Sequence, residues 1–170
     1  RVILLNRHVL AIRPKMWLAN DGNYREMRWF TPWNRPHEIE EYALPACVRA
    51  VSDQTHVPFG DALFCASDTT LGVELCEELF TPQSPHIGMA LEGAEIIMNA
   101  SGSHHELRKL HRRVQLIQEA TLKLGGVYLY ANQRGCDGDR LYYDGCALIA
   151  VNGSIVAQLS LIHISDGARE

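Results

Sequence analysis

Short apolar runs recur along most of this 170-residue chain, separated by glycine, proline and polar turns. The runs are rich in β-branched and aromatic residues and are too short for helices, so they predict strands. The predicted strands cover residues 2–5, 9–12, 62–66, 71–76, 95–99, 127–131, 146–151 and 154–158. Asn152-Gly153, between the last two runs, is a strong signal for a β-hairpin, and Asn6-Arg7-His8 predicts another between the first two.

Two segments have the spacing of helices instead. One is short, at 84–91, and the other covers 105–124, where apolar positions recur every three or four residues until Gly125-Gly126 ends the pattern. Residues 14–36 show no sustained period and are expected to form a long loop. Strand–helix–strand segments predict parallel pairs and hairpins predict antiparallel ones, so the fold class is α/β with mixed sheets. No shift in composition marks a domain boundary.

Composition excludes several classes of protein. Hydrophobic content is 46%, charged content is 21% and the net charge is −4, so we expect neither nucleic acid nor an anionic membrane as a partner. No apolar run approaches the length of a membrane span.

The cysteines are odd in number and lack C-x-x-C spacing, which favours reduced thiols in the cytoplasm. They are Cys47, Cys65, Cys76, Cys136 and Cys146, of which the last two are expected to be small buried residues. His104 and His105 point apart on any regular element, so no metal site is expected.

Cys76 lies at a position that is typical of a catalytic nucleophile. It ends the apolar strand and opens the acidic segment Cys76-Glu77-Glu78, and a turn from strand to helix is where a nucleophile is exposed above a sheet. The helix N-terminus behind it favours an anion such as a thiolate. The alternative is a structural cysteine at a strand end, because free cysteine is among the most buried residue types.

Four motifs, in order along the chain, resemble the nitrilase superfamily and, within it, the glutaminase domains of glutamine-dependent NAD synthetases. They are Arg13-Pro14-Lys15-Met16 with Asn20-Asp21-Gly22-Asn23-Tyr24-Arg25-Glu26, then Glu74-Leu75-Cys76-Glu77-Glu78-Leu79, Asn99-Ala100-Ser101-Gly102-Ser103-His104-His105 and Ala131-Asn132-Gln133-Arg134-Gly135-Cys136-Asp137-Gly138. The resemblance covers residues 1–158 as one partial domain and implies an αββα sandwich with mixed sheets, truncated at its N-terminus. Residues 159–170 do not resemble the family and are expected to be an artefactual or disordered tail.

The resemblance also implies roles for individual residues. Cys76 would attack the side-chain amide of L-glutamine and release ammonia from a thioester intermediate. The Lys15 ammonium and the backbone N–H of Glu77 would stabilise the oxyanion. Without the resemblance, Lys15 would be taken as a solvated lysine at a hairpin end. The positions that resemble glutamine-binding residues are Tyr24, Ser103 and Lys109, and Lys109 faces the cysteine only if the long helix begins near His105.

Two features of the family have no counterpart among these residues: the general-base glutamate upstream of the lysine, and the synthetase domain that would bind ATP with Mg²⁺. We therefore interpret the chain as an internal fragment, expected to be inactive alone. Glu26 is the first candidate if another residue supplies the base.

The implied function is release of ammonia for amidation of nicotinic acid adenine dinucleotide, in a cytoplasmic homo-oligomer. The alternatives are a stand-alone amidase or carbamoylase and a non-catalytic nitrilase-like module. Trp17, Trp29 and Trp33 would cover the pocket or contact another subunit.

Overall fold

The computed structural model describes residues 1–159, so the predicted tail lies outside the described residues apart from Leu159. The chain divides into two compact units, the first covering Arg1–Phe64 and the second running from Cys65 onward. Among residues 1–159, no helix combines the length and hydrophobicity that a membrane crossing requires.

The first unit contains a mixed sheet of four strands within residues 1–64. In spatial order they are β1 (Val2–Leu5), β2 (His8–Ile12), β4 (His56–Gly60) and β3 (Ile39–Ala43). β1 and β2 form the predicted antiparallel hairpin, β2 runs parallel to β4, and β3 is antiparallel to β4. Asn6 and Arg7 have φ angles of 48° and 68°, which is the backbone of a tight hairpin turn. The predicted first hairpin is confirmed.

A small core supports this sheet. It consists of Val9, Leu44 and Val57, against which Val48 of α1 (Ala46–Ser52) packs. The pattern of the sequence does not predict β3, α1 or β4, and for β3 and α1 the reason is their exposure. All five residues of β3 are exposed, and no residue of α1 is buried, so neither element carries the apolar period from which it could be recognised.

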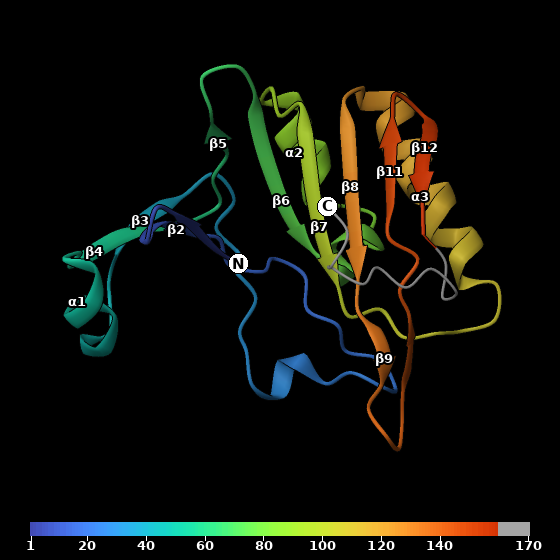
Figure 1. Cartoon of the computed structure of the whole chain (residues 1–170), viewed down its shortest axis with the longest axis horizontal. Helices are drawn as coiled ribbons and strands as arrows, with labels where there is room; N and C mark the ends of the chain where they lie inside the picture. Colours follow the sequence, from blue (N-terminus) through green and yellow to red (C-terminus); the bar gives the residue numbers. More distant parts are fainter. Residues whose placement is uncertain (160–170) are drawn as a thin grey trace, which may run out of the picture. The chain divides into compact units, whose positions relative to one another are not determined.

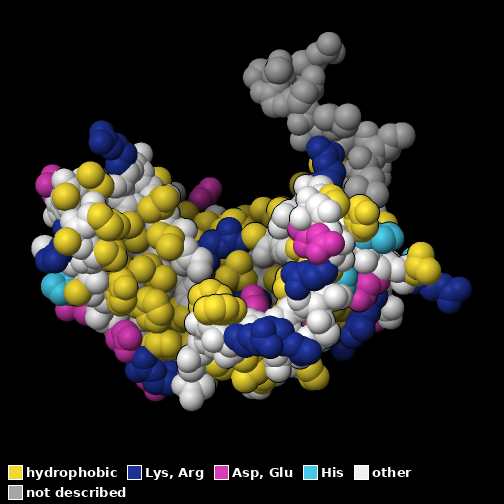
Figure 2. All heavy atoms as spheres, turned by 90° about the horizontal axis from the view of Figure 1, so that it is seen from below, with side chains coloured by type: hydrophobic (Ala, Val, Ile, Leu, Met, Phe, Trp, Pro, Cys, Tyr) yellow, Lys and Arg dark blue, Asp and Glu magenta, His cyan; other side chains and the backbone are white. Residues whose placement is uncertain are grey.

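The predicted long loop over 14–36 is confirmed, with one turn of 3₁₀ helix, η1 (Glu26–Arg28), inside it. Backbone hydrogen bonds tie the loop to itself, from Trp33 N to Lys15 O and from Glu26 N to Ala19 O, each 3.0 Å. Large apolar side chains are unusually exposed in this unit, and the face at the left of Figure 2 is mostly apolar. The most exposed are Val2, Leu4, Leu5, Met27, Trp29, Phe30, Ile39 and Val51.

In the second unit, six strands within residues 64–159 form a mixed sheet (Figure 1). In spatial order they are β12 (Ser154–Gln158), β11 (Leu148–Val151), β8 (Val127–Asn132), β7 (Ile96–Ser101), β6 (Thr70–Leu75) and β5 (Phe64–Cys65). β6, β7 and β8 are parallel, whereas β11 pairs antiparallel with both β8 and β12. Both the mixed sheet and the second predicted hairpin are confirmed.

Helices α2 (Pro85–Leu91) and α3 (Lys109–Leu124) cover one face of this sheet (Figure 1). The packing is close at Gly72, where an added Cβ would lie only 2.6 Å from the Met89 sulfur. The prediction that the long helix begins at His105 is wrong, because the helix begins at Lys109 after Arg108 in a left-handed conformation. Leu107 matched the helical period but lies in the turn before the helix and is 89% exposed, so the period continued there by coincidence.

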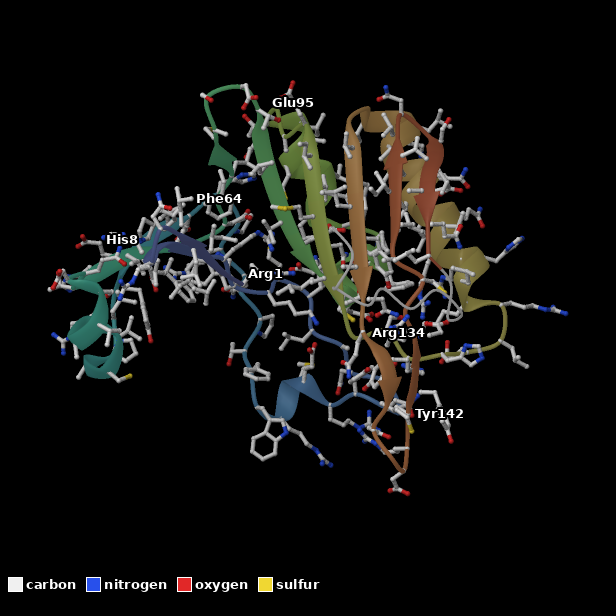
Figure 3. The ribbon with its side chains drawn as sticks, viewed as in Figure 1. Arg1, His8, Phe64, Glu95, Arg134 and Tyr142 are labelled. Carbon is white, nitrogen blue, oxygen red and sulfur yellow. The ribbon has the colours of Figure 1, made fainter. Side chains whose placement is uncertain are left out.

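A further hairpin, β9 (Arg134–Cys136) with β10 (Tyr142–Asp144), was not predicted (Figure 3). Its turn is organised by the Asp137 carboxylate, which accepts the backbone N–H groups of Arg140 and Leu141, each at 2.8 Å. Cys146 is buried as predicted. Cys136 is exposed, contrary to the prediction, because it lies on this short two-stranded ribbon.

Candidate active site

Cys76 lies at the turn that the sequence predicts. β6 ends at Leu75, and Cys76 is the first residue of η2 (Cys76–Leu79), a single 3₁₀ turn rather than a longer helix. Its φ angle is 45°, in the left-handed region that costs a residue with a side chain roughly 1–3 kcal/mol. The residue is partly exposed. A strained, accessible thiol at a strand-to-helix turn is the arrangement of a nucleophile rather than of a core cysteine.

Two side chains accept hydrogen bonds from the backbone N–H groups of Leu75 and Cys76 at this turn. The Glu78 carboxylate, which is fully buried, accepts the backbone N–H of Leu75 at 2.7 Å. The Asn99 side-chain oxygen accepts the backbone N–H of Cys76 at 3.2 Å. Because the Cys76 N–H is already engaged, it is not available to an oxyanion. The assignment of the next N–H along the chain, that of Glu77, to this task stays a prediction.

A buried polar cluster lies behind the turn, centred on the carboxylate of Glu74, which is 0% exposed. Glu74 accepts the backbone N–H of His86 at 3.1 Å, the Asn99 amide at 3.2 Å and the hydroxyl of Tyr128. Burial by itself raises the pKa of the Glu74 carboxyl, but its partners, His86 foremost, bring the pKa below the ordinary value. Burial and the neighbouring Glu74 charge raise the pKa of Tyr128 well above its usual value.

Ser103, a predicted glutamine-binding residue, is buried in a second polar cluster. The Asn132 side chain accepts its N–H at 2.8 Å and donates to its carbonyl at 3.0 Å. Arg113 donates to the Ser103 hydroxyl at 3.1 Å and to the Asp144 carboxylate at 2.7 Å. A guanidinium only donates, so the Ser103 hydroxyl accepts from Arg113 and keeps its own hydrogen for another acceptor.

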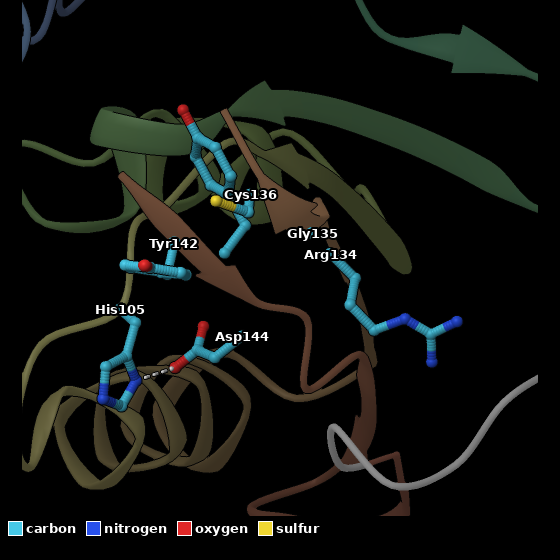
Figure 4. Close-up of a pocket in the computed structure, with 7 residues that line it drawn as sticks. His105, Arg134, Gly135, Cys136, Tyr142 and Asp144 are labelled. Atoms are coloured by element: carbon cyan, nitrogen blue, oxygen red, sulfur yellow. Dashed lines mark hydrogen bonds and ion pairs between the residues drawn. The ribbon is translucent and has the colours of Figure 1, made fainter. Parts of the chain in front are cut away.

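Asp144 also borders a surface hollow of about 490 Å³ (Figure 4). There its second oxygen contacts the His105 ring at 3.2 Å, and the other lining residues belong to the same β9–β10 hairpin as Asp144. Sequence reasoning missed Arg113, Asn132 and Asp144, because their roles depend on strands and a helix that are far apart along the chain. Within the part of the chain that the structure describes, no group of three or more His, Cys, Asp or Glu residues could hold a metal ion.

Lys15 lies in the first unit and is paired with Glu26. Its ammonium donates to the two carboxylate oxygens of Glu26 at 3.0 and 2.7 Å, and the side chains are 13% and 28% exposed. Glu26 also accepts the backbone N–H of Ala19. The lysine is therefore held by a carboxylate and is not a solvated surface charge. Glu26, the candidate base in the sequence, is engaged with Lys15 instead.

The other predicted site residues lie in different surroundings. Tyr24 is half-buried in the loop of the first unit, where its N–H donates to Asp21 at 2.8 Å. Lys109 is the first residue of α3 and pairs with Glu106 at 3.2 Å. The helix start that would turn Lys109 towards Cys76 is not the observed one. The glutamine-binding roles of Tyr24, Ser103 and Lys109 remain predictions.

Comparison with known proteins places these residues in a family. The carbon–nitrogen hydrolase family matches residues 1–162. This chain belongs to that family. It is 64% identical to the glutamine-dependent NAD(+) synthetase of Saccharomyces cerevisiae and 63% identical to that of Mus musculus, in each case over 98% of this chain and 23% of the relative. The chain thus spans about a quarter of the length of these relatives.

A solved structure agrees with the sequence match. The crystal structure of a glutamine-dependent NAD(+) synthetase from Cytophaga hutchinsonii is similar to this carbon–nitrogen hydrolase chain with a TM-score of 0.72 and 30% identity. The similarity covers 88% of this chain and 23% of that one. The predicted nitrilase-like α/β fold is confirmed.

Proposed function

We propose that this chain is the glutaminase part of a glutamine-dependent NAD synthetase, which releases ammonia from L-glutamine by thiol catalysis. The observation that carries the proposal is Cys76, placed on a strained strand-to-helix turn in a chain 64% identical to such a synthetase. The ammonia would pass to a synthetase domain, which uses ATP with Mg²⁺ to amidate nicotinic acid adenine dinucleotide. We further propose a cytoplasmic homo-oligomer.

The chemistry follows from the properties of a thiol. The Cys76 sulfur attacks the side-chain carbonyl carbon of glutamine, and the carbonyl oxygen gains the negative charge. Lys15 and the N–H of Glu77 stabilise this oxyanion, and loss of one such donor typically costs about 3–4 kcal/mol in the transition state. The C–N bond then breaks, and a protonated general base supplies the proton with which ammonia leaves. Water hydrolyses the remaining thioester to glutamate. The family resemblance assigns the base to a glutamate upstream of these residues.

The charges of glutamine explain why three further residues are proposed to bind it. The Ser103 hydroxyl has a hydrogen to donate and therefore suits an oxygen of the substrate. Lys109 supplies a point charge for the α-carboxylate, and Tyr24 supplies a hydroxyl. Each contact is made equally in the ground state and in the transition state, so each contributes mainly to the affinity for glutamine.

The test is replacement of the nucleophile in the full-length protein. Cys76→Ala should abolish glutamine hydrolysis, while added ammonia still supports NAD synthesis because the synthetase domain does not use the thiol. Release of glutamate and formation of NAD are measured in parallel. Cys65→Ala is the matched control, since Cys65 is an exposed free cysteine of the same unit and should leave both rates unchanged. Hydrolysis by Cys76→Ala at the parent rate would remove Cys76 from the mechanism.

A further inference from the structure

The acidic and amide residues behind Cys76 form a chain of contacts that ends at the nucleophile. Glu74, Asn99 and Tyr130 occupy adjacent positions across β6, β7 and β8, because Glu74 pairs with Asn99 and Asn99 pairs with Tyr130. Asn99 has two ends with opposite properties. Its NH₂ group donates to Glu74, and its oxygen accepts the N–H of Cys76.

Both ends of the Asn99 amide require this orientation. Rotating the amide by half a turn would place its oxygen against the Glu74 carboxylate and its NH₂ group against the N–H of Cys76. The first contact sets two acceptors against each other, and the second sets two donors. Asn99 is only 2% exposed, so water cannot compensate for either mismatch.

Glu74 has to be a carboxylate for a related reason. One of its oxygens accepts the Asn99 amide at 3.2 Å and the other accepts the backbone N–H of His86 at 3.1 Å. Both partners can only donate, so both oxygens must accept. A glutamine side chain has one accepting and one donating end and would set a donor against one of the two partners.

We propose that Glu74 and Asn99 are positioning residues for Cys76. The buried carboxylate fixes the Asn99 amide, and the amide oxygen holds the backbone of Cys76 in its left-handed conformation, which aims the thiol and keeps the Cys76 N–H away from the oxyanion. This inference rests on the proposed function for the role of the thiol. It adds the two residues that hold the thiol in place, neither of which touches the substrate.

The test measures kcat and KM for glutamine in the full-length protein. Asn99→Ala removes the acceptor of the Cys76 N–H and should lower kcat by about tenfold to a hundredfold, the usual effect of a misplaced reacting group, with KM changed less than about threefold. Glu74→Gln should act in the same direction. Tyr128→Phe is the matched control. It removes the hydroxyl that donates to the Glu74 carboxylate and accepts from the Asn99 amide at 3.0 Å, but it leaves the contacts with Glu74 and with the Cys76 N–H that orient this amide.

The outcomes separate positioning from general damage. A parental kcat in Asn99→Ala, or an equal loss of kcat in Tyr128→Phe, would overturn the proposal. If Asn99→Ala does not fold, as judged by thermal unfolding, Glu74→Gln decides alone, because it keeps the size of the side chain. A parental kcat in Glu74→Gln would then overturn the proposal.

A second measurement separates this inference from the proposed function. The rate at which iodoacetamide alkylates Cys76 is followed by mass spectrometry, with the exposed Cys47 as an internal reference in the same sample. Alkylation of Cys76, relative to Cys47, should slow in Asn99→Ala and not in Tyr128→Phe. If the parent does not hydrolyse glutamine, the proposed function fails while this ratio still decides the positioning role. An unchanged ratio in Asn99→Ala would then overturn it.

Discussion

Single residues of the same type play different parts in this protein, and burial is what separates them. In the segment Cys76-Glu77-Glu78, the two glutamates look alike as charges at the start of a helix. The structure makes Glu78 a fully buried cap of the Leu75 N–H. Lys15 likewise differs from an ordinary lysine, because the Glu26 carboxylate holds its ammonium in one place. A held ammonium is suited to stabilise a charge that develops at a defined point.

Replacement of this lysine should affect the rate rather than the affinity for glutamine. In the full-length protein, Lys15→Met should lower kcat by about a hundredfold or more, because the positive charge is needed only where the oxyanion develops, and KM should change little. Steady-state glutaminase kinetics provide the measurement. Lys123→Met, at an exposed lysine of α3, is the control and should match the parent. A raised KM with an unchanged kcat would assign Lys15 to substrate binding instead.

At the scale of elements, α3 shows how a helix combines packing with a polar contact. Arg112 and Arg113 are neighbours in the sequence, but the helix turns Arg112 to the surface and Arg113 into the protein, where it is 0% exposed. Arg113 then joins α3 to the strand β10 through Asp144 and to the segment after β7 through Ser103. The helix thereby fixes the residue that is proposed to bind the substrate.

This buried pair gives a prediction about stability. Arg113→Met leaves Asp144 charged, buried and without its main partner, so the free energy of unfolding should fall by about 3–5 kcal/mol. Adding Asp144→Leu should recover part of the loss. Arg112→Met, the exposed neighbour, should change the free energy of unfolding by about 0.5 kcal/mol or less. Urea unfolding of the three variants measures the differences. A loss as large in Arg112→Met as in Arg113→Met would show that the buried pair is not the cause.

At the scale of the whole molecule, both units expose large apolar side chains. Val2 and Leu4 of β1 are 51% and 66% exposed, and β1 forms one edge of its sheet. Leu91 and Leu107 in the second unit are 78% and 89% exposed. Exposed apolar side chains beside an open strand edge favour association with another chain.

The 170-residue chain, prepared alone, should therefore associate and show no measurable glutaminase activity. Its mass in solution, measured by light scattering after size-exclusion chromatography, should exceed the 19.1 kDa of one chain. Hydrolysis should be absent because the general base proposed for the family is not among these residues. A single monomeric peak would contradict the first expectation. Turnover of about 1 s⁻¹ or faster, an ordinary enzymatic rate, would contradict the second and make Glu26 the candidate base.

The sequence by itself determined the elements whose signals are local. The β1–β2 and β11–β12 hairpins, the strands of the parallel core and α2 follow from apolar period and turn residues within a few positions. Cys76 was identified by the strand before it and the acidic turn after it. The sequence did not predict β3, α1 or the β9–β10 hairpin, because exposed or very short elements have no apolar period to detect. The start of α3 was misplaced because Leu107 continued the period outside the helix.

Only the tertiary structure decided which polar residues support the site. The contact of Asn99 with Cys76 spans 23 residues, and that of Arg113 with Asp144 spans 31. No local pattern records such pairs, since strand pairing and helix packing bring them together. Burial then sets their chemistry, because a polar group removed from water must find its partner within the protein. Glu74 and Arg113 are ordinary charged residues in the sequence, and the fold turns them into the supports of the residues proposed to act on glutamine.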